Sequence, residues 1–205
     1  MPKQVDHEQR RRQIAEAVWR IACTRGLEDV SLRQVAAEAG VSMRLVQYYF
    51  GTRDNLLLLS LRLLNDAAER RAEERVRATT DPSDLRAVLR AVIAEMLPLD
   101  EDRRITTLVH LAYFVRSLND ERLSVLFRDA PPALEELMAT LIRQAQERGE
   151  VPDRVDPRRE ADLLMTMVDG LQSGMLLGRR TAGETMELLD HQLDRIFTLP
   201  SGAQD

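Results

Sequence analysis

Residues 31–57, SLRQVAAEAGVSMRLVQYYFGTRDNLL, predict two short helices joined by a four-residue turn. Ser31 is a helix N-cap that is followed three residues later by Gln34, as in a capping box. Gly40 ends this first helix after about two turns, and Ser42 can cap a second helix over 43–50. A small residue, a glycine able to adopt positive φ, an apolar valine and a new N-cap form the turn of a helix-turn-helix. An ordinary pair of antiparallel helices is the alternative for this spacing alone.

The second short helix carries a surface suited to reading DNA. Val46 and Phe50 are four residues apart and are expected to face the core. The other side presents four side chains that can reach base edges: Met43, Arg44, Gln47 and Tyr48. Arginine pairs with guanine, glutamine pairs with adenine, and apolar or aromatic groups contact the thymine methyl. The pattern therefore favours a helix that enters the major groove.

Composition and charge agree with a helical DNA-binding protein. The 205 residues are 44% hydrophobic, 31% charged and only 4% aromatic, which favours an all-α fold of about nine helices with a substantial core. Residues 1–55 hold nine basic and seven acidic side chains, a net charge of +2, whereas the remainder has a net charge of −7. We therefore expect DNA to contact the N-terminal quarter of the chain.

Other function classes lack the residues that they need. Cys23 is the single cysteine, and the three histidines are scattered, so neither a disulfide nor a structural metal site is predicted. No phosphate-binding glycine loop or nucleophile elbow is present, so we expect no enzyme, no catalytic residues and no cofactor. The longest apolar stretch, 56–64, is far shorter than the roughly 20 residues that span a bilayer. With an N-terminus unlike a secretory signal, a soluble cytoplasmic protein without membrane contact is expected.

From Gln13 to Leu57 the sequence resembles the DNA-binding domain of TetR-family transcriptional regulators. The resemblance rests on the T/S-x-R helix start, the AGVS turn, the aromatic pair followed by Phe, and a basic residue before a Leu-rich helix. It implies a helix-turn-helix domain over 7–54 and a helical ligand-binding and dimerisation domain over 55–200. Arg44 and Gln47 stand where many members have Gly and Tyr, which leaves the operator sequence open.

The resemblance also implies roles for individual residues. The side chains expected to hold the phosphate backbone are Ser31, Ser42, Tyr48, Tyr49 and Arg53. Those expected to approach base edges are Arg33, Met43, Arg44 and Gln47. Packing of either tyrosine against the first helix is the structural alternative. The implied protein is a homodimer that binds a palindromic operator in double-stranded DNA and, as is usual in the family, represses transcription.

The penultimate helix, expected to run from Pro157 to Arg180, contains three glycines spaced four residues apart near its C-terminal end. Each glycine costs roughly 0.5–1 kcal/mol relative to alanine, so close packing against another helix is the expected reason. Because the family dimerises through its last two helices, we expect a dimer interface that includes Gly170, Gly174, Gly178, Leu189, Leu193 and Ile196. A close crossing within one subunit is the alternative.

A small-molecule site is expected in the C-terminal part of the chain. Six of the eight methionines lie beyond residue 95, and methionine adapts well to varied ligands. The resemblance implies an effector cavity, for which plausible lining residues are Met96, His110, Tyr113, Phe114, Met138, Leu164, Val168, Leu171 and Met175. The effector is expected to be small and largely apolar, with an identity that the sequence does not give. An ordinary core is the alternative for the methionines, and an ordinary half-buried histidine is the alternative for His110.

Two other functions are compatible with the same helices. A helical protein-interaction module could have lost DNA binding, but the retained Arg33, Arg44 and Arg53 speak against that alternative. An activator of the same family would share every motif described above. The local sequence therefore favours a DNA-binding regulator, and repression rests on the family resemblance.

Overall fold

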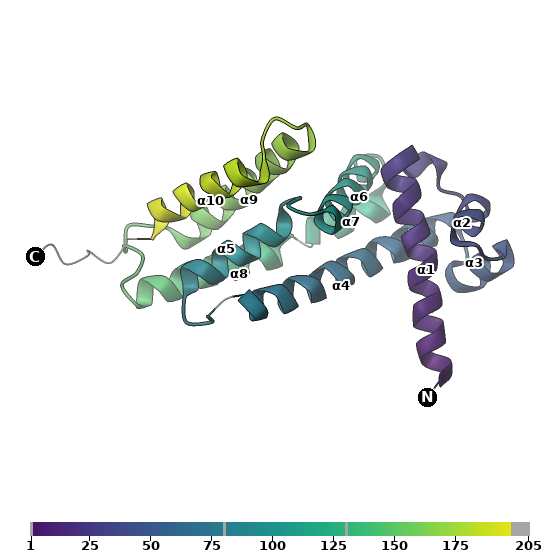
Figure 1. Ribbon diagram of the computed structural model, residues 1–205, viewed down its shortest axis with the longest axis horizontal. Helices are drawn as coiled ribbons and strands as arrows, with labels where there is room; N and C mark the ends of the chain where they lie inside the picture. Colours follow the sequence, from purple (N-terminus) through teal and green to yellow (C-terminus); the bar gives the residue numbers. More distant parts are fainter. Residues whose placement is uncertain (1, 80, 130, 198–205) are drawn as a thin grey trace, which may run out of the picture. The chain divides into compact units, whose positions relative to one another are not determined.

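A computed structural model describes residues 2–79, 81–129 and 131–197. These residues form ten α-helices and one short 3-10 helix (Figure 1). The all-α prediction is confirmed. Two compact units make up the chain: the first unit comprises Met1–Arg70 and Ile105–Phe127, and the second unit comprises Arg71–Arg104 and Arg128–Asp205. None of the described helices is long and apolar enough to cross a membrane.

The first unit is built around the N-terminal helices. Its complete elements are α1 (Pro2–Arg25), η1 (Leu27–Asp29), α2 (Leu32–Ala39) and α3 (Met43–Phe50). It also holds the first part of α4 (Arg53–Thr79) and most of α6 (Glu101–Ser117) and α7 (Glu121–Asp129). One apolar core joins these helices, and Ile14, Phe50 and Leu61 are among its buried members. The predicted boundary between residues 54 and 55 falls inside α4, and the functional division at that point stays a prediction.

The two short helices begin and end as the sequence predicts. The Ser31 hydroxyl accepts a hydrogen bond from the Gln34 amide at 3.2 Å, and the Ser42 hydroxyl accepts one from the Leu45 amide at 3.2 Å. Gly40 has φ of +66°, which a side chain with Cβ rarely adopts. These caps fix the turn between α2 and α3 and thereby the orientation of α3.

Helix α1 begins at Pro2, so Asp6 lies within it. Proline is well tolerated in the first helical turn, where its missing amide proton would have no partner in the helix. The longer helix carries residues 7–12 as a continuous helical segment.

Two buried aromatic side chains tie α1 and α6 to the backbone of α4. The Trp19 indole of α1 donates a hydrogen bond to the Ser60 carbonyl at 3.0 Å. The Tyr113 hydroxyl of α6 donates to the Leu57 carbonyl at 3.0 Å, and burial strongly raises the pKa of this hydroxyl. Large aromatic groups stabilise a core best when their polar atoms are also satisfied. The three helices are therefore joined within the first unit by apolar contact and by directed hydrogen bonds.

The second unit is a bundle of α5 (Leu85–Met96), α8 (Pro131–Glu147), α9 (Pro157–Leu176) and α10 (Ala182–Ile196), completed by the end of α4. Helix α8 packs against α5 and α9, and α10 packs against α5 and α9 (Figure 1). Thr181 and Glu184 form a capping box at the start of α10. This unit has its own apolar core, to which Met138, Leu164 and Leu193 belong.

Helix α9 ends earlier than the sequence predicts. Its last residue is Leu176, and Gly178 follows with φ of +68°. The Gly178 amide donates to the Met175 carbonyl, and the Arg179 amide donates to the Gly174 carbonyl. Gly178 is therefore explained by the left-handed turn that ends α9, which removes one member of the predicted glycine stripe.

Candidate nucleic-acid interface

The outer face of α3 presents the four side chains that the sequence assigns to base reading. Arg44 and Gln47 are exposed, and Met43 and Tyr48 are 49% and 73% exposed. Val46 and Phe50, on the other side of the helix, lie in the core of the first unit. Arg44 and Gln47 can bond to base edges, and Met43 and Tyr48 can contact a thymine methyl, so this exposed face is well suited to a groove of DNA. We call Met43, Arg44, Gln47 and Tyr48 the reading face.

The arginines of the first unit fall into two groups. Arg20 and Arg25 pair with Glu38, at 2.9 and 3.5 Å, and Arg12 pairs with Glu16 at 3.0 Å. Arg33 and Arg44 are exposed, and no described carboxylate lies within ion-pair distance of either guanidinium. An arginine without an internal partner keeps its five donors available for phosphate or guanine. Arg33 and Arg44 are also the two arginines that the sequence places nearest to base edges.

Tyr49 and Tyr48 have different surroundings, although both are predicted to hold phosphate. The Tyr49 ring packs against the core, and its hydroxyl lies 2.7 Å from Nδ1 of His7 on α1. Tyr48 meets Tyr49 edge-on, with ring centroids 5.1 Å apart, and points its remaining surface to solvent. Packing against the first helix, the alternative for either tyrosine, therefore describes Tyr49 and not Tyr48. Their roles as phosphate contacts stay predictions.

Arg53 has a structural task that sequence reasoning missed. Its Nε donates to the Val30 carbonyl at 2.6 Å, and its Nη2 donates to the Leu27 carbonyl at 2.9 Å. The Leu27 carbonyl also accepts from the Val30 amide, and a guanidinium is a strong charged donor to both carbonyls. Arg53 therefore fastens the start of α4 to the segment between α1 and α2. A phosphate contact by the same side chain stays a prediction.

Ser31 and Ser42 lie at the N-termini of α2 and α3, where both hydroxyls are used as caps. The first amides of a helix and the positive end of its dipole favour a phosphate at that place. Both serines are therefore positioned for the phosphate contacts predicted for them. Neither contact is tested by the geometry of the chain alone.

The residues predicted to line an effector cavity are divided between the two units. In the first unit, Tyr113 is a core residue, Phe114 is partly exposed with its ring edge-on to Phe127, and His110 bonds to Asn65. In the second unit the predicted residues belong to the core or pack against it: Met96, Met138, Leu164, Val168, Leu171 and Met175. The ordinary core proposed as the alternative therefore describes most of the second set.

His110 is a predicted effector residue whose pKa is shifted strongly by its surroundings. Its Nε2 lies 2.7 Å from Oδ1 of Asn65, which joins α6 to α4 within the first unit. Burial lowers the pKa of His110 to about 4. A neutral imidazole of this kind donates from one nitrogen and accepts at the other, which suits either a structural bond or a polar ligand.

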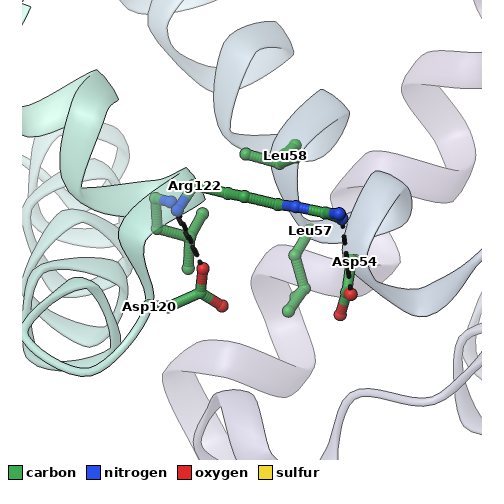
Figure 2. Close-up of a pocket in the computed structure, with 6 residues that line it drawn as sticks. Asp54, Leu57, Leu58, Asp120 and Arg122 are labelled. Atoms are coloured by element: carbon green, nitrogen blue, oxygen red, sulfur yellow. Dashed lines mark hydrogen bonds and ion pairs between the residues drawn. The ribbon is translucent and has the colours of Figure 1, made fainter.

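Two concavities of the described residues lie away from the predicted effector residues. Figure 2 shows a crevice between α4 and α7, where Arg122 lies 3.8 Å from Asp54. Its volume of about 10 Å³ holds at most one water molecule. A larger concavity of about 280 Å³ is lined by Gly170, Gly174, Arg179 and Arg180. Among the described side chains, no group of three or more His, Cys, Asp or Glu is placed to hold a metal ion.

The side chains predicted for the dimer interface have unequal access to a partner. Leu189, Leu193 and Ile196 are buried in the core of their own subunit, and their place in a dimer interface stays a prediction. Sequence periodicity marks an apolar face but does not say what covers it, and here α5 and α9 pack against α10. Gly170 is exposed, and a Cβ added there would meet no atom within 4 Å. At Gly174 an added Cβ would lie 3.3 Å from Cδ of Arg180, so this glycine makes room for a side chain of the same subunit.

Comparison with known proteins agrees with these features. Residues 14–59 match the family of bacterial regulatory proteins of the tetR family, and residues 85–198 match the C-terminal domain of BetI-type transcriptional repressors. The HTH-type transcriptional regulator PksA of Bacillus subtilis is 34% identical over 173 residues, which cover 83% of this chain and 80% of PksA. The regulator BetI of Brucella canis is 28% identical over 178 residues, which cover 87% of this chain and 85% of BetI.

Solved structures show the same fold over nearly the whole chain. A proposed transcriptional regulator from Saccharomonospora viridis, solved in complex with choline, has a TM-score of 0.83 at 26% identity. The match covers 94% of this chain and 100% of that protein. Both ends of the chain therefore match one family, in the order expected for a DNA-binding domain followed by a regulatory domain. This chain belongs to the TetR family of DNA-binding transcriptional regulators, with a BetI-type C-terminal domain, and it is not an enzyme.

Proposed function

We propose that the protein is a ligand-responsive repressor that binds a palindromic operator as a homodimer. The observation that carries this proposal is the reading face of α3, where Arg44 is exposed and has no ion-pair partner among the described side chains. In this proposal Arg33, Met43, Arg44 and Gln47 approach base edges, and the hydroxyl and guanidinium groups around them hold phosphates. A protein that acts on operator DNA works in the cytoplasm.

Two copies of α3 are needed to read a palindrome. Successive major grooves on one side of B-DNA are about 34 Å apart, so a dimer must hold its two reading helices at that separation. The exposed surface of α9 and α10 supports a dimer contact there. It includes Gly170 and three partly exposed leucines: Leu163, Leu177 and Leu188.

Gly170→Leu tests the dimer without disturbing the subunit. The position faces open space in one chain, and leucine is a better helix former than glycine, so the subunit itself should fold normally. Overpacking at a close contact between copies typically costs roughly 1–3 kcal/mol per site. We expect sedimentation to show a shift from dimer to monomer. Gly170→Ala is the matched control, and a Gly170→Leu protein that remains fully dimeric would remove α9 from the interface.

An effector would act through α4 in this proposal. Helix α4 contributes residues 53–70 to the first unit and residues 71–79 to the second, and its 27 residues span about 40 Å at 1.5 Å per residue. A tilt of such a helix changes the separation of the two copies of α3. By linkage, operator DNA must weaken effector binding by the same factor as the effector weakens DNA binding.

The residues around the proposed effector site favour a largely apolar ligand. The relative from Saccharomonospora viridis was solved with choline, and quaternary ammonium groups bind to the faces of aromatic rings. In the described part of the second unit the single aromatic residue is Phe197, which is buried in the core. Choline is therefore a useful probe of effector binding. We expect it to bind only weakly to the second unit.

DNA binding is tested most simply with the region upstream of the protein's own gene. In a gel-shift titration with excess random DNA, the wild-type protein should retain this fragment. A footprint should show two protected half-sites one helical turn apart. A protein that binds the fragment no better than random DNA would contradict the proposal, and an activator would bind the same site but raise transcription from it.

A further inference from the structure

A basic segment of α1 lies outside the predicted DNA contacts. Residues 7–12 contain His7 and three consecutive arginines. Arg12 pairs with Glu16 at 3.0 Å, and Arg10 donates a hydrogen bond to Oε1 of Gln13 at 2.7 Å. Arg11 is exposed and forms no ion pair with a described side chain, as is true of Arg33 and Arg44. Arg11 is therefore a further guanidinium near α3 that is not used in an ion pair with a described side chain.

Arg11 and His7 both meet Tyr49 of α3. The guanidinium carbon of Arg11 lies 6.0 Å from the centroid of the Tyr49 ring, the outer limit of a cation–π contact. The His7 ring is edge-on to the same tyrosine, with centroids 5.7 Å apart, and its Nδ1 lies 2.7 Å from the tyrosine hydroxyl. Tyr49 in turn supports Tyr48, which is part of the reading face. The four side chains form one continuous cluster between α1 and α3.

The hydrogen bond to Tyr49 decides which group His7 can offer to a ligand. When the hydroxyl donates to Nδ1, the proton of a neutral imidazole resides on Nε2. His7 is exposed, so in the tautomer whose Nδ1 accepts from the Tyr49 hydroxyl its Nε2–H is available as a donor. An Nε2–H beside an exposed guanidinium and an exposed tyrosine is a set of donors, and a phosphate oxygen satisfies such a set.

We propose that His7 and Arg11 bind the DNA phosphate backbone beside Tyr48, so that the DNA-binding surface extends from α3 onto α1. The inference rests on the proposed function, since it assumes that α3 enters the major groove. Tyr49 acts as the platform that holds both α1 side chains next to the reading face. The contact carries no sequence information, because phosphates are the same at every base pair.

Salt-dependent binding of full-length Arg11→Gln and Arg12→Gln tests the role of Arg11. Both variants lose one positive charge from neighbouring positions, so their effects on the long-range field are matched. Arg11→Gln should lower the affinity for operator and random DNA by the same factor. It should also flatten the slope of log K against log salt by about 0.9 per subunit, the value for one phosphate contact. Arg12→Gln should leave the slope unchanged.

Equal losses in the two variants, or no loss in Arg11→Gln, would overturn the assignment of Arg11. Failure of the wild-type protein to prefer its operator would instead contradict the proposed function.

His7 is tested by a double-mutant cycle with Tyr49→Phe, which removes the hydroxyl but keeps the ring. His7→Ala should weaken DNA binding severalfold in the wild-type background and much less when Tyr49 is already Phe, because the imidazole is then no longer held in place. Circular dichroism and thermal melting should show that all four proteins are folded. Additive losses, or no loss from His7→Ala, would overturn the role of His7.

Discussion

The two units of the chain join their helices by different polar contacts. In the second unit, partly buried arginines reach carboxylates: Arg90 of α5 binds Asp190 of α10 at 2.6 Å, and Arg103 binds Glu95 at 2.8 Å. In the first unit, the ion pairs of Arg20 and Arg25 with Glu38 lie at the surface, and the more buried donors Trp19, Tyr113 and Arg53 reach backbone carbonyls. Arg33 and Arg44 take part in neither kind of contact with a described side chain. Both guanidinium groups therefore remain available for DNA.

Removal of the Arg53 side chain is expected to have the largest effect on stability, and it tests the hydrogen bonds to backbone carbonyls in the first unit. Arg53→Ala should lower the free energy of unfolding by about 2–3 kcal/mol, because carbonyls at the end of η1 lose charged donors. Urea denaturation would measure the loss. Arg122→Ala is the control, because the ion pair between Arg122 and Asp54 is exposed and, at 3.8 Å, contributes little to stability. If Arg53→Ala unfolds like the control but binds DNA weakly, Arg53 is a phosphate contact and not a structural residue.

The half-buried pair of His110 and Asn65 in the first unit makes the free energy of unfolding depend on pH. Because burial lowers the pKa of His110 to about 4 in the folded protein, the unfolded chain takes up a proton first as pH falls. This contribution is fully present above the ordinary histidine pKa near 6.5 and is lost as pH falls toward 4. At pH 5 the loss is about 2 kcal/mol.

His110→Gln keeps a donor for Asn65 but cannot titrate, so it isolates this contribution. The stability difference between pH 7.5 and pH 5 should be smaller in the variant by about 2 kcal/mol, because all other groups titrate alike in both proteins. Denaturation at the two pH values measures it. An identical pH dependence in variant and wild type would show that His110 is open to water.

The smallest expected effect concerns the ion pairs of the second unit. Arg90→Ala should cost at most about 1 kcal/mol, because Arg90 and Asp190 are both partly exposed and solvent screens their attraction. The cost should shrink further in 1 M salt. Urea titrations at low and high salt would show this. A salt-independent loss as large as that from Arg53→Ala would erase the distinction between the two units.

How much could be predicted differs between the units for a physical reason. Caps and turns depend on residues that are adjacent in sequence, so Ser31, Gly40 and Ser42 could be identified directly, and so could the outward face of α3. The core position of Leu189 and the use of Gly178 in a turn depend on where a helix ends and what packs on it. The task of Arg53 depends on carbonyls more than twenty residues away. Local sequence patterns do not predict contacts with residues so distant in the chain.

The assignment of α3 as the reading helix depends most on a contact between Arg44 and a base. Affinity should be measured by fluorescence anisotropy for Arg44→Ala and wild type, on operator DNA, on operators changed one base pair at a time, and on random DNA. Arg44→Ala should lose about 1–3 kcal/mol on the operator, lose little on random DNA, and stop discriminating at one position in each half-site. Equal losses on operator and random DNA, with discrimination unchanged at every position, would contradict the assignment of α3 as the reading helix through Arg44.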